Sequence, residues 1–200
     1  MEHYFIAKEH NKEDYFEFSH KFSDFDFVFK SCDDVFSKDQ VDYGTNVLIK
    51  TIVKKVELFG NVLDIGCGYG PIGIILSKFF NQTKFTLCDI NQTAVELATE
   101  NAQKNHTENI EKIIVSNAYE NIQGKFDFIV SNPPIKAGKK TLLEILLGSY
   151  ERLNDGGSLI FVIKKKFGED SVKKALQNKF QKVEILERDS GYYVLSATKQ

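Results

Sequence analysis

Beginning at Asn61, short apolar runs alternate along the chain with longer amphipathic stretches. The apolar runs have the length and composition of buried strands, whereas the amphipathic stretches repeat their apolar residues at helical spacing. The predicted strands are residues 62–65, 84–89, 112–116, 126–131, 158–163, 183–187 and 192–197. The predicted helices are residues 71–80, a helix capped by Asn91 or Thr93, residues 142–153, which stop at Asn154-Asp155-Gly156-Gly157, and a lysine-rich helix at about 169–178.

This alternation predicts how the strands are connected. Strands separated by helices form a mostly parallel sheet that carries helices on both faces. The last two strands are separated only by a turn at Asp189-Ser190-Gly191, so they form a hairpin at one edge. We therefore expect an α/β fold: a doubly wound, mostly parallel, seven-stranded Rossmann-like sheet with an antiparallel C-terminal hairpin strand. Ligands of such sheets bind beyond the carboxyl ends of the strands.

The N-terminal part of the chain has a different pattern. Phe25, Phe27 and Phe29 alternate strictly, which predicts a strand at 24–30, and a helix is expected at 44–58. We divide the chain into an N-terminal cap or β segment, residues 1–43, and a main domain, residues 44–200. Two interpretations of the cap stay open: it covers the sheet and packs by its phenylalanines, or part of it closes over a ligand.

Composition narrows the class of protein. The 200 residues include 26 Lys and Arg against 28 Asp and Glu, which excludes attachment to nucleic acid by bulk positive charge but permits a local basic patch. The three cysteines lack metal-ligand spacing, so we expect buried thiols and no metal. No apolar run is long enough to cross a bilayer and the N-terminus has no signal-like segment, which predicts a cytoplasmic protein without a membrane partner.

The first predicted strand runs into a glycine cluster, VLDIGCGYG, at residues 62–70. Glycines there let a ligand approach the backbone closely. The spacing Gly68-x-Gly70-x-x-Gly73 also fits a dinucleotide site, but Asp64 would repel a pyrophosphate. A cationic ligand without phosphate, such as S-adenosylmethionine, is favoured instead. Asp89 ends the second strand, where a carboxylate accepts hydrogen bonds from a ribose diol.

The tetrapeptide Ser131-Asn132-Pro133-Pro134 follows the fourth strand. Consecutive prolines hold the backbone and present carbonyls that we expect no local amide to claim. The Asn132 side-chain oxygen and a proline carbonyl could together accept both hydrogens of a planar exocyclic amine. They would stabilise the positive charge that develops as its nitrogen attacks a methyl group. We predict Asn132, Pro133 and Pro134 as catalytic residues; the alternative is a turn that merely closes the strand.

The motifs DIGCGYG, CDIN and SNPP, in this order, resemble the class I S-adenosylmethionine-dependent methyltransferases over about residues 40–200. SNPPIKAGKK, with residues 35–39 and 41–45, is similar in particular to the bacterial small-subunit ribosomal RNA guanine 2-amino methyltransferases. The resemblance implies S-adenosylmethionine as cofactor and RNA as partner, and places Asp42 and Thr45 near the cofactor mouth. The candidate cofactor-binding residues are then Asp64, Gly66, Cys67, Gly68, Gly70, Asp89, Ile90, Asn117, Ala118 and Asn132.

Lysines follow the fourth and fifth strands, at the same edge of the sheet as the proline motif. There they could contact RNA phosphates while the target base enters the pocket; the alternative is a solvated lysine fringe. Many related enzymes carry an aromatic residue after the second proline, but this chain has Ile135. The candidate RNA-contacting residues are Ile135, Lys136, Lys139, Lys140, Lys164, Lys165 and Lys166.

These observations favour a methyltransferase that acts on the 2-amino group of guanine in small-subunit ribosomal RNA. An adenine 6-amino group or a protein glutamine amide would use the same chemistry. A non-catalytic assembly factor that binds the cofactor and RNA without turnover is a different class and stays open. A nicotinamide dehydrogenase is opposed by Asp64.

Overall fold

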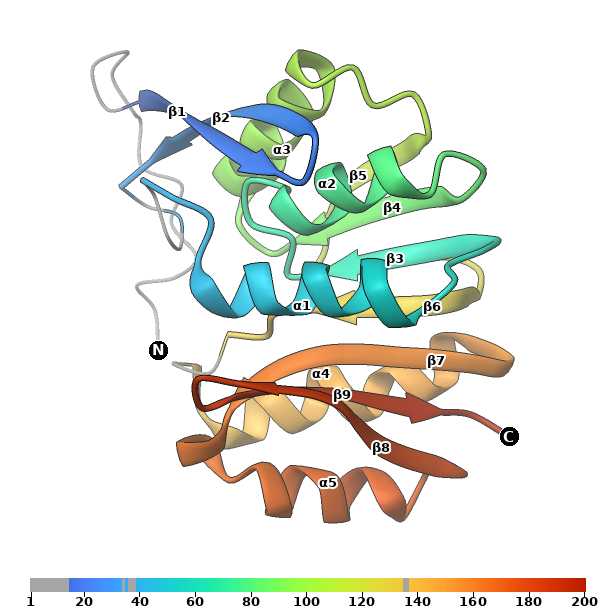
Figure 1. Cartoon of the computed structure of the whole chain (residues 1–200). Coiled ribbons are helices and arrows are strands. Elements are labelled where there is room, and N and C mark those ends of the chain that lie inside the picture. Colours follow the sequence, from blue (N-terminus) through green and yellow to red (C-terminus); the bar gives the residue numbers. More distant parts are fainter. Residues whose placement is uncertain (1–14, 34, 36–38, 135–136) are drawn as a thin grey trace.

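The computed structural model describes residues 15–33, 35, 39–134 and 137–200 (Figure 1). Its strands are β1 (Tyr15–Phe22), β2 (Phe25–Cys32), β3 (Asn61–Ile65), β4 (Lys84–Asp89), β5 (Ile110–Val115), β6 (Phe126–Ser131), β7 (Leu153–Lys164), β8 (Lys182–Asp189) and β9 (Tyr192–Thr198). Its helices are α1 (Tyr43–Lys55), α2 (Pro71–Phe79), α3 (Gln92–Lys104), α4 (Lys139–Arg152), the short 3-10 turn η3 (Lys165–Phe167) and α5 (Glu169–Gln177).

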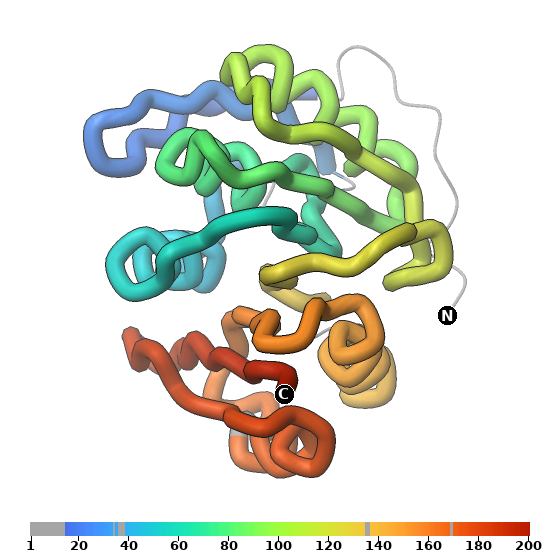
Figure 2. The backbone as a smooth tube through the Cα atoms, turned by 90° about the vertical axis from the view of Figure 1, so that its right-hand side faces the viewer, coloured from blue at the N-terminus to red at the C-terminus, as the bar shows by residue number. Residues whose placement is uncertain are grey.

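Seven of these strands form the main sheet, in the order β5-β4-β3-β6-β7-β9-β8. The pairings from β5 to β7 are parallel, and β9 runs antiparallel between β7 and β8. Figure 2 shows α1 and α2 on one side of the sheet and α4 on the opposite side. The predicted fold class is therefore confirmed, including the hairpin at one edge. No helix within the described ranges is both long and apolar enough to span a membrane.

The two faces of the sheet bury separate hydrophobic clusters. Side chains alternate between the faces of a strand with a period of two residues. In β3, Val62 belongs to the cluster beneath α1, α2 and α3, whereas Leu63 and Ile65 belong to the cluster beneath α4 and α5. The same alternation decides on which face each polar side chain at a strand end will lie.

The N-terminal hairpin of β1 and β2 lies against α3 (Figure 1). The side-chain amides of two asparagines of α3 form hydrogen bonds with the backbone of β2, as a neighbouring strand would. Asn101 accepts from the amide of Lys30 and donates to its carbonyl, at 2.7 and 2.9 Å, and Asn105 does the same with Val28, at 3.0 and 2.8 Å. Because side-chain amides satisfy the exposed edge of β2, the hairpin can dock on a helix without a further strand.

Local departures from the expected elements have physical causes. The strand at 24–30 was expected, but its partner β1 was not, because the polar run from Ser19 to Lys21 interrupts the alternation of its phenylalanines and none of its residues is fully buried. Residues 154–157 were expected to lie outside the strand that begins at 158, which is wrong, because β7 already pairs with β6 at Leu153. Three extra residues then loop out as a bulge, where Gly156 has φ 77°. The division of the chain at residue 43 stays a prediction, although Phe27 and Phe29 share the cluster beneath α1–α3.

Candidate active site

Polar side chains at four strand ends lie on one face of the sheet. They are Asp64, Asp89, Asn132 and Lys164. The residues two positions before them are Val62, Leu87, Val130 and Val162, and all four belong to the buried cluster beneath α1–α3. Because side chains two residues apart share a face, the polar residues continue that face at the carboxyl ends of the parallel strands.

The glycine loop between β3 and α2 leaves open space beside its backbone. Gly66 and Gly68 have φ of 72° and 57°, which favour glycine, and a Cβ added at either would meet no atom within 4 Å. The amides of Gly66 and Cys67 both donate to the Cys88 carbonyl of β4, at 2.9 Å. Gly73 serves a different purpose, because a Cβ there would lie 2.7 Å from Leu87 Cδ1. The loop therefore combines close helix–strand packing with room for a ligand.

Asp64 is completely buried in β3, one residue before the strand ends and the loop begins. Its Oδ2 accepts from the Gly73 amide of α2 at 3.0 Å, whereas its Oδ1 has no partner within the described part of the chain. Burial raises the pKa of Asp64 to about 7, against the opposing effect of the Gly73 amide. The carboxylate already occupies the amide end of α2, where a dinucleotide pyrophosphate would bind, while its free oxygen suits a cation.

Asp89 ends β4 and holds the loop from the other side. Its Oδ2 accepts from the Gly68 amide and its Oδ1 from the Asn91 amide, each at 2.9 Å. Burial raises the pKa of Asp89, and these backbone donors work against that shift. Each carboxylate oxygen keeps a second lone pair, so the ribose-diol role is compatible with this geometry. Together with the space at the glycines, this donor set fits an adenosine-bearing cation.

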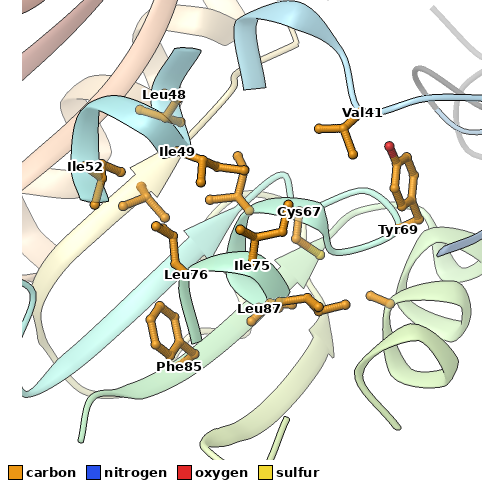
Figure 3. Packing of buried hydrophobic residues seen from close by; sticks show 14 of the residues in the cluster. Val41, Leu48, Ile49, Ile52, Cys67, Tyr69, Ile75, Leu76, Phe85 and Leu87 are labelled. Carbon is orange, nitrogen blue, oxygen red and sulfur yellow. The ribbon is translucent and has the colours of Figure 1, made fainter. Parts of the chain in front are cut away.

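Two loop residues anchor the cofactor side of the site in the core. Figure 3 shows Cys67 close to Ile75 of α2, and Tyr69 to one side of the cluster, near Val41. Cys67 is buried and its side chain belongs to the core cluster, so only its backbone is available to a ligand. Tyr69 meets Phe18 and Phe29 of the hairpin at centroid distances of 5.9 and 5.6 Å. The N-terminal hairpin therefore supports the glycine loop, a role that the sequence pattern did not reveal.

The candidates beyond β5 are placed less tightly. Asn117 is exposed, and its Nδ2 donates to Glu120 Oε1 at 2.9 Å. Ala118 adopts a left-handed backbone with φ 45°, and Ile90 is half-buried after Asp89. The expected role of Asn117 at an adenine edge stays a prediction, as do those of Ala118 and Ile90.

Asn132 is held in one orientation by residues from the start of α1. Its Nδ2 donates to Asp42 Oδ2 at 2.7 Å and to Thr45 Oγ1 at 2.9 Å. Asp42 is also the N-cap of α1, because its two oxygens accept from the amides of Gly44 and Thr45. Both contacts use the amide nitrogen, so Oδ1 of Asn132 keeps its acceptor capacity, with no hydrogen bond from the described residues.

The two prolines differ in what their carbonyls can do. The Ala137 amide donates to the Pro134 carbonyl at 3.0 Å, so the expectation that no local amide claims either carbonyl is wrong for Pro134. The prolines do not prevent this bond, because the chain turns back three residues later. No amide of a described residue donates to the Pro133 carbonyl. Asn132 Oδ1 and the Pro133 carbonyl are therefore the available pair of acceptors.

Within the described residues, the predicted lysines follow β6, or end and follow β7. Lys139 and Lys140 begin α4, and Lys164 ends β7 immediately before Lys165 and Lys166 of η3. All but Lys164 are exposed, and Lys164 is half-buried. Its Nζ lies 4.8 Å from the Tyr192 ring centroid. Side-chain hydrogen bonding with Tyr192 raises the pKa of Lys164, and the charge of Asp42 adds a smaller effect in the same direction. Ile135 and Lys136 fall outside the described residues.

Two hollows of the structure lie away from these side chains. One, of about 420 Å³, lies between α3 and β5, and the other, of about 260 Å³, lies between α1 and β8. Neither is lined by Asp64, Asp89 or Asn132. The case for a ligand site at the sheet edge therefore rests on the polar groups and on the space at Gly66 and Gly68.

The amino-acid sequence is similar to one family model and to curated bacterial proteins. A family model described as "Methyltransferase small domain" matches residues 26–196. The uncharacterized protein YbxB of Bacillus subtilis (strain 168) is 39% identical over 200 residues, which cover 99% of this chain and 98% of that protein. Ribosomal RNA small subunit methyltransferase C of Serratia proteamaculans (strain 568) is 38% identical over 158 residues, 77% of this chain but 44% of that protein.

A solved structure shares the fold. The T. thermophilus 16S rRNA N2 G1207 methyltransferase, in complex with AdoMet and guanosine, superposes with a TM-score of 0.83 at 23% identity. The match covers 93% of this chain and 51% of that chain. This chain therefore spans about half or less of the two RNA methyltransferases.

Proposed function

The chain belongs to the methyltransferase small domain family, and from that premise we propose that it methylates the exocyclic 2-amino group of a guanine in small-subunit ribosomal RNA, with S-adenosylmethionine as cofactor. The observation that carries this proposal is the orientation of Asn132. Asp42 and Thr45 bind its amide nitrogen and leave Oδ1 as an acceptor beside the Pro133 carbonyl. An amino group with two hydrogens in one plane matches two such acceptors.

The glycine-loop side of the site is where the cofactor would be held. When bound, S-adenosylmethionine supplies a methyl group on a positively charged sulfur. The unpartnered Oδ1 of Asp64 would meet the positive charge of the ligand, and Asp89 would accept from its ribose hydroxyls. The backbone at Gly66 and Gly68 leaves the space for a close approach.

The proline-motif side of the site would prepare the acceptor nitrogen. An aromatic amine is a poor nucleophile because its lone pair is conjugated with the ring. Asn132 Oδ1 and the Pro133 carbonyl would bind its two hydrogens, draw electron density onto the nitrogen and stabilise the charge that develops during attack. The carboxylate of Asp42 strengthens this effect, because a charged acceptor on Nδ2 polarises the Asn132 amide toward Oδ1.

RNA as the partner is supported by the lysines and by the relatives. Lys139 and Lys140 lie in the first turn of α4, whose N-cap Gly138 provides no side-chain hydrogen bond. Positive charge is unfavourable at a helix N-terminus, and the ion pair within α4 between Lys140 and Glu144, at 3.8 Å, is exposed, so these lysines contribute little to the stability of α4. Phosphate binding accounts for them better, and two of the similar proteins carry ribosomal RNA methyltransferase names.

The experiment is transfer of labelled methyl groups to ribosomal RNA and to small subunits from a strain that lacks the gene. Mass analysis of the nucleosides is expected to find N2-methylguanosine, absent when Asn132→Ala protein is used. Label in N6-methyladenosine or in a protein glutamine would change the acceptor and overturn the guanine assignment. Cofactor binding without transfer to any of these substrates would instead support the non-catalytic alternative.

A further inference from the structure

Two tyrosines and a lysine form a cluster at the start of α1, which we call the aromatic platform: Tyr43, Lys164 and Tyr192. The two rings lie with centroids 5.5 Å apart, and Lys164 Nζ lies 4.8 Å from the Tyr192 centroid. Tyr43 is 48% exposed, although its hydroxyl donates to Asp189 Oδ1 at 2.8 Å. The ring that faces solvent is thus held in place by the turn between β8 and β9.

The platform adjoins the catalytic asparagine through the backbone of α1. Asp42, which binds Asn132, directly precedes Tyr43. Tyr192 packs so closely on the next residue that a Cβ at Gly44 would lie 2.6 Å from its Cε1. All of these contacts lie within three residues at the first turn of one helix.

Strand register gives the same placement independently. Ser131 pairs with Phe161 in the parallel ladder of β6 and β7, and Lys164 ends β7 three residues further on, beyond the point where β6 gives way to Asn132. Lys164 in turn pairs with Tyr192 across β7 and β9. Lys164 and Tyr192 also share the α1 face of the sheet with Asn132, because Val162 and Val194 belong to the cluster on that face.

We propose that the aromatic platform binds an unpaired nucleotide next to the target base, with the base against Tyr43 and Tyr192 and the intervening phosphate at Lys164. This inference rests on the proposed function, and it identifies the substrate as RNA that is single-stranded around the target. Bases stack on aromatic rings regardless of their sequence, and lysines follow the backbone. Because position 135 is isoleucine, the tetrapeptide itself is not followed by an aromatic ring that could take this role.

The charges around the platform agree with a base rather than a phosphate at Tyr43. The hydroxyls of Tyr43 and Ser190 lower the pKa of Asp189, which keeps its negative charge beside the hydroxyl end of Tyr43. A phosphate would be repelled by this carboxylate, although the positive charge of Lys50 partly offsets it, whereas the uncharged face of a base would not. Positive charge is found instead at Lys164 and in η3, whose Lys165 amide donates to the Gly191 carbonyl at 2.9 Å.

The test uses a fluorescein-labelled, unstructured twelve-nucleotide RNA with a single central guanosine, titrated with the whole chain and followed by anisotropy. Tyr43→Ala is expected to weaken binding about tenfold, while Tyr43→Phe, which keeps the ring, retains most of the affinity. Phe59→Ala is the matched control. Phe59 is 61% exposed and lies just before β3, at the amino ends of the parallel strands, whereas the aromatic platform lies at their carboxyl ends. It is expected to bind the RNA as the wild type does.

The salt dependence separates stacking from charge. Lys164→Gln is expected to reduce the slope of log affinity against log salt by about 0.7, the value for one phosphate contact on a single strand. Tyr43→Ala is expected to leave this slope unchanged. Lys125→Gln makes the same charge change in the loop before β6, at the opposite edge, and should not alter the slope.

Equal affinity of Tyr43→Ala and wild type would overturn the platform, as would equal losses in Tyr43→Ala and Tyr43→Phe. If the wild-type protein nevertheless methylates RNA, the proposed function survives such a result. If the wild-type protein transfers no methyl group to RNA, the proposed function fails and the platform fails with it.

Discussion

The two halves of the candidate site are stabilised in different ways. In the cofactor half, Asp64 and Asp89 accept from backbone amides that lie 2 to 21 residues away in the chain. In the acceptor half, Asn132 is bound by side chains 87 and 90 residues away. The first half is therefore built by local folding, whereas the second exists only after α1 has packed against the sheet. Mutations in the second half should consequently impair catalysis before they impair cofactor binding.

The largest expected effect is that of Asn132→Ala. Loss of a preorganised acceptor at the developing charge should lower kcat by about a hundredfold or more, whereas the affinity for S-adenosylmethionine should stay close to that of wild type. Single-turnover methyl transfer and calorimetry measure the two quantities. The control is Asn154→Ala, because Asn154 donates to Asp127 Oδ1 at 2.7 Å far from the site. An equal loss of cofactor affinity in Asn132→Ala would mean that the halves are not separate.

Asp42→Ala tests whether the orientation of Asn132 matters by itself. Without its charged partner the amide can rotate, so kcat should fall about tenfold to a hundredfold. Loss of the α1 N-cap should also lower the free energy of unfolding by about 1 kcal/mol. Asp42→Asn keeps one acceptor oxygen but loses the negative charge, so it should recover much of the stability and only part of kcat, as measured by thermal unfolding and steady-state kinetics. Wild-type kcat in Asp42→Ala would show that Asn132 needs no positioning.

Two glycines sharpen the contrast within the cofactor half. A Cβ at Gly73 would press on Leu87, so Gly73→Ala should cost about 1–3 kcal/mol of stability. Gly68→Ala places its Cβ in open space and strains a backbone with φ 57°, which costs about 1–2 kcal/mol. Gly68→Ala should also weaken the binding of S-adenosylmethionine, because the added Cβ would occupy space that the ligand needs, whereas Gly73→Ala should lower stability alone. Denaturant unfolding and calorimetry distinguish the two variants.

The smallest expected effect is on the pH dependence of the cofactor half. The pKa of Asp64 is raised to about 7, so in the ligand-free protein its carboxyl loses its proton as the pH rises through 7. A cationic ligand prefers the charged form, so affinity for S-adenosylmethionine should increase severalfold between pH 6 and 7.5. Asp64→Asn should remove this increase. The stability of the ligand-free protein should change in the opposite direction. Burial raises the pKa of Asp64, so its contribution to the free energy of unfolding is fully present below the unfolded pKa and is lost as the pH rises through 7.

Much of the cofactor half could be predicted because its information is local. Glycines, a carboxylate within a strand and a second carboxylate at the next strand end follow one another over residues 64–89. The alternation of apolar residues also predicted the sheet, its mostly parallel strand direction and the hairpin at its edge. The family match confirms the resemblance that these motifs indicated.

What local pattern could not supply was decided where distant segments meet. The sequence showed Asp42, Asn132 and Tyr192 as separate residues, and no periodicity relates them. Their contacts arise because the first turn of α1 lies over the ends of β6 and β7, so that one carboxylate both caps the helix and orients the asparagine. Spacing along a chain can specify which residues share a face, but only the packing of a helix on that face determines which side chains come within hydrogen-bond distance.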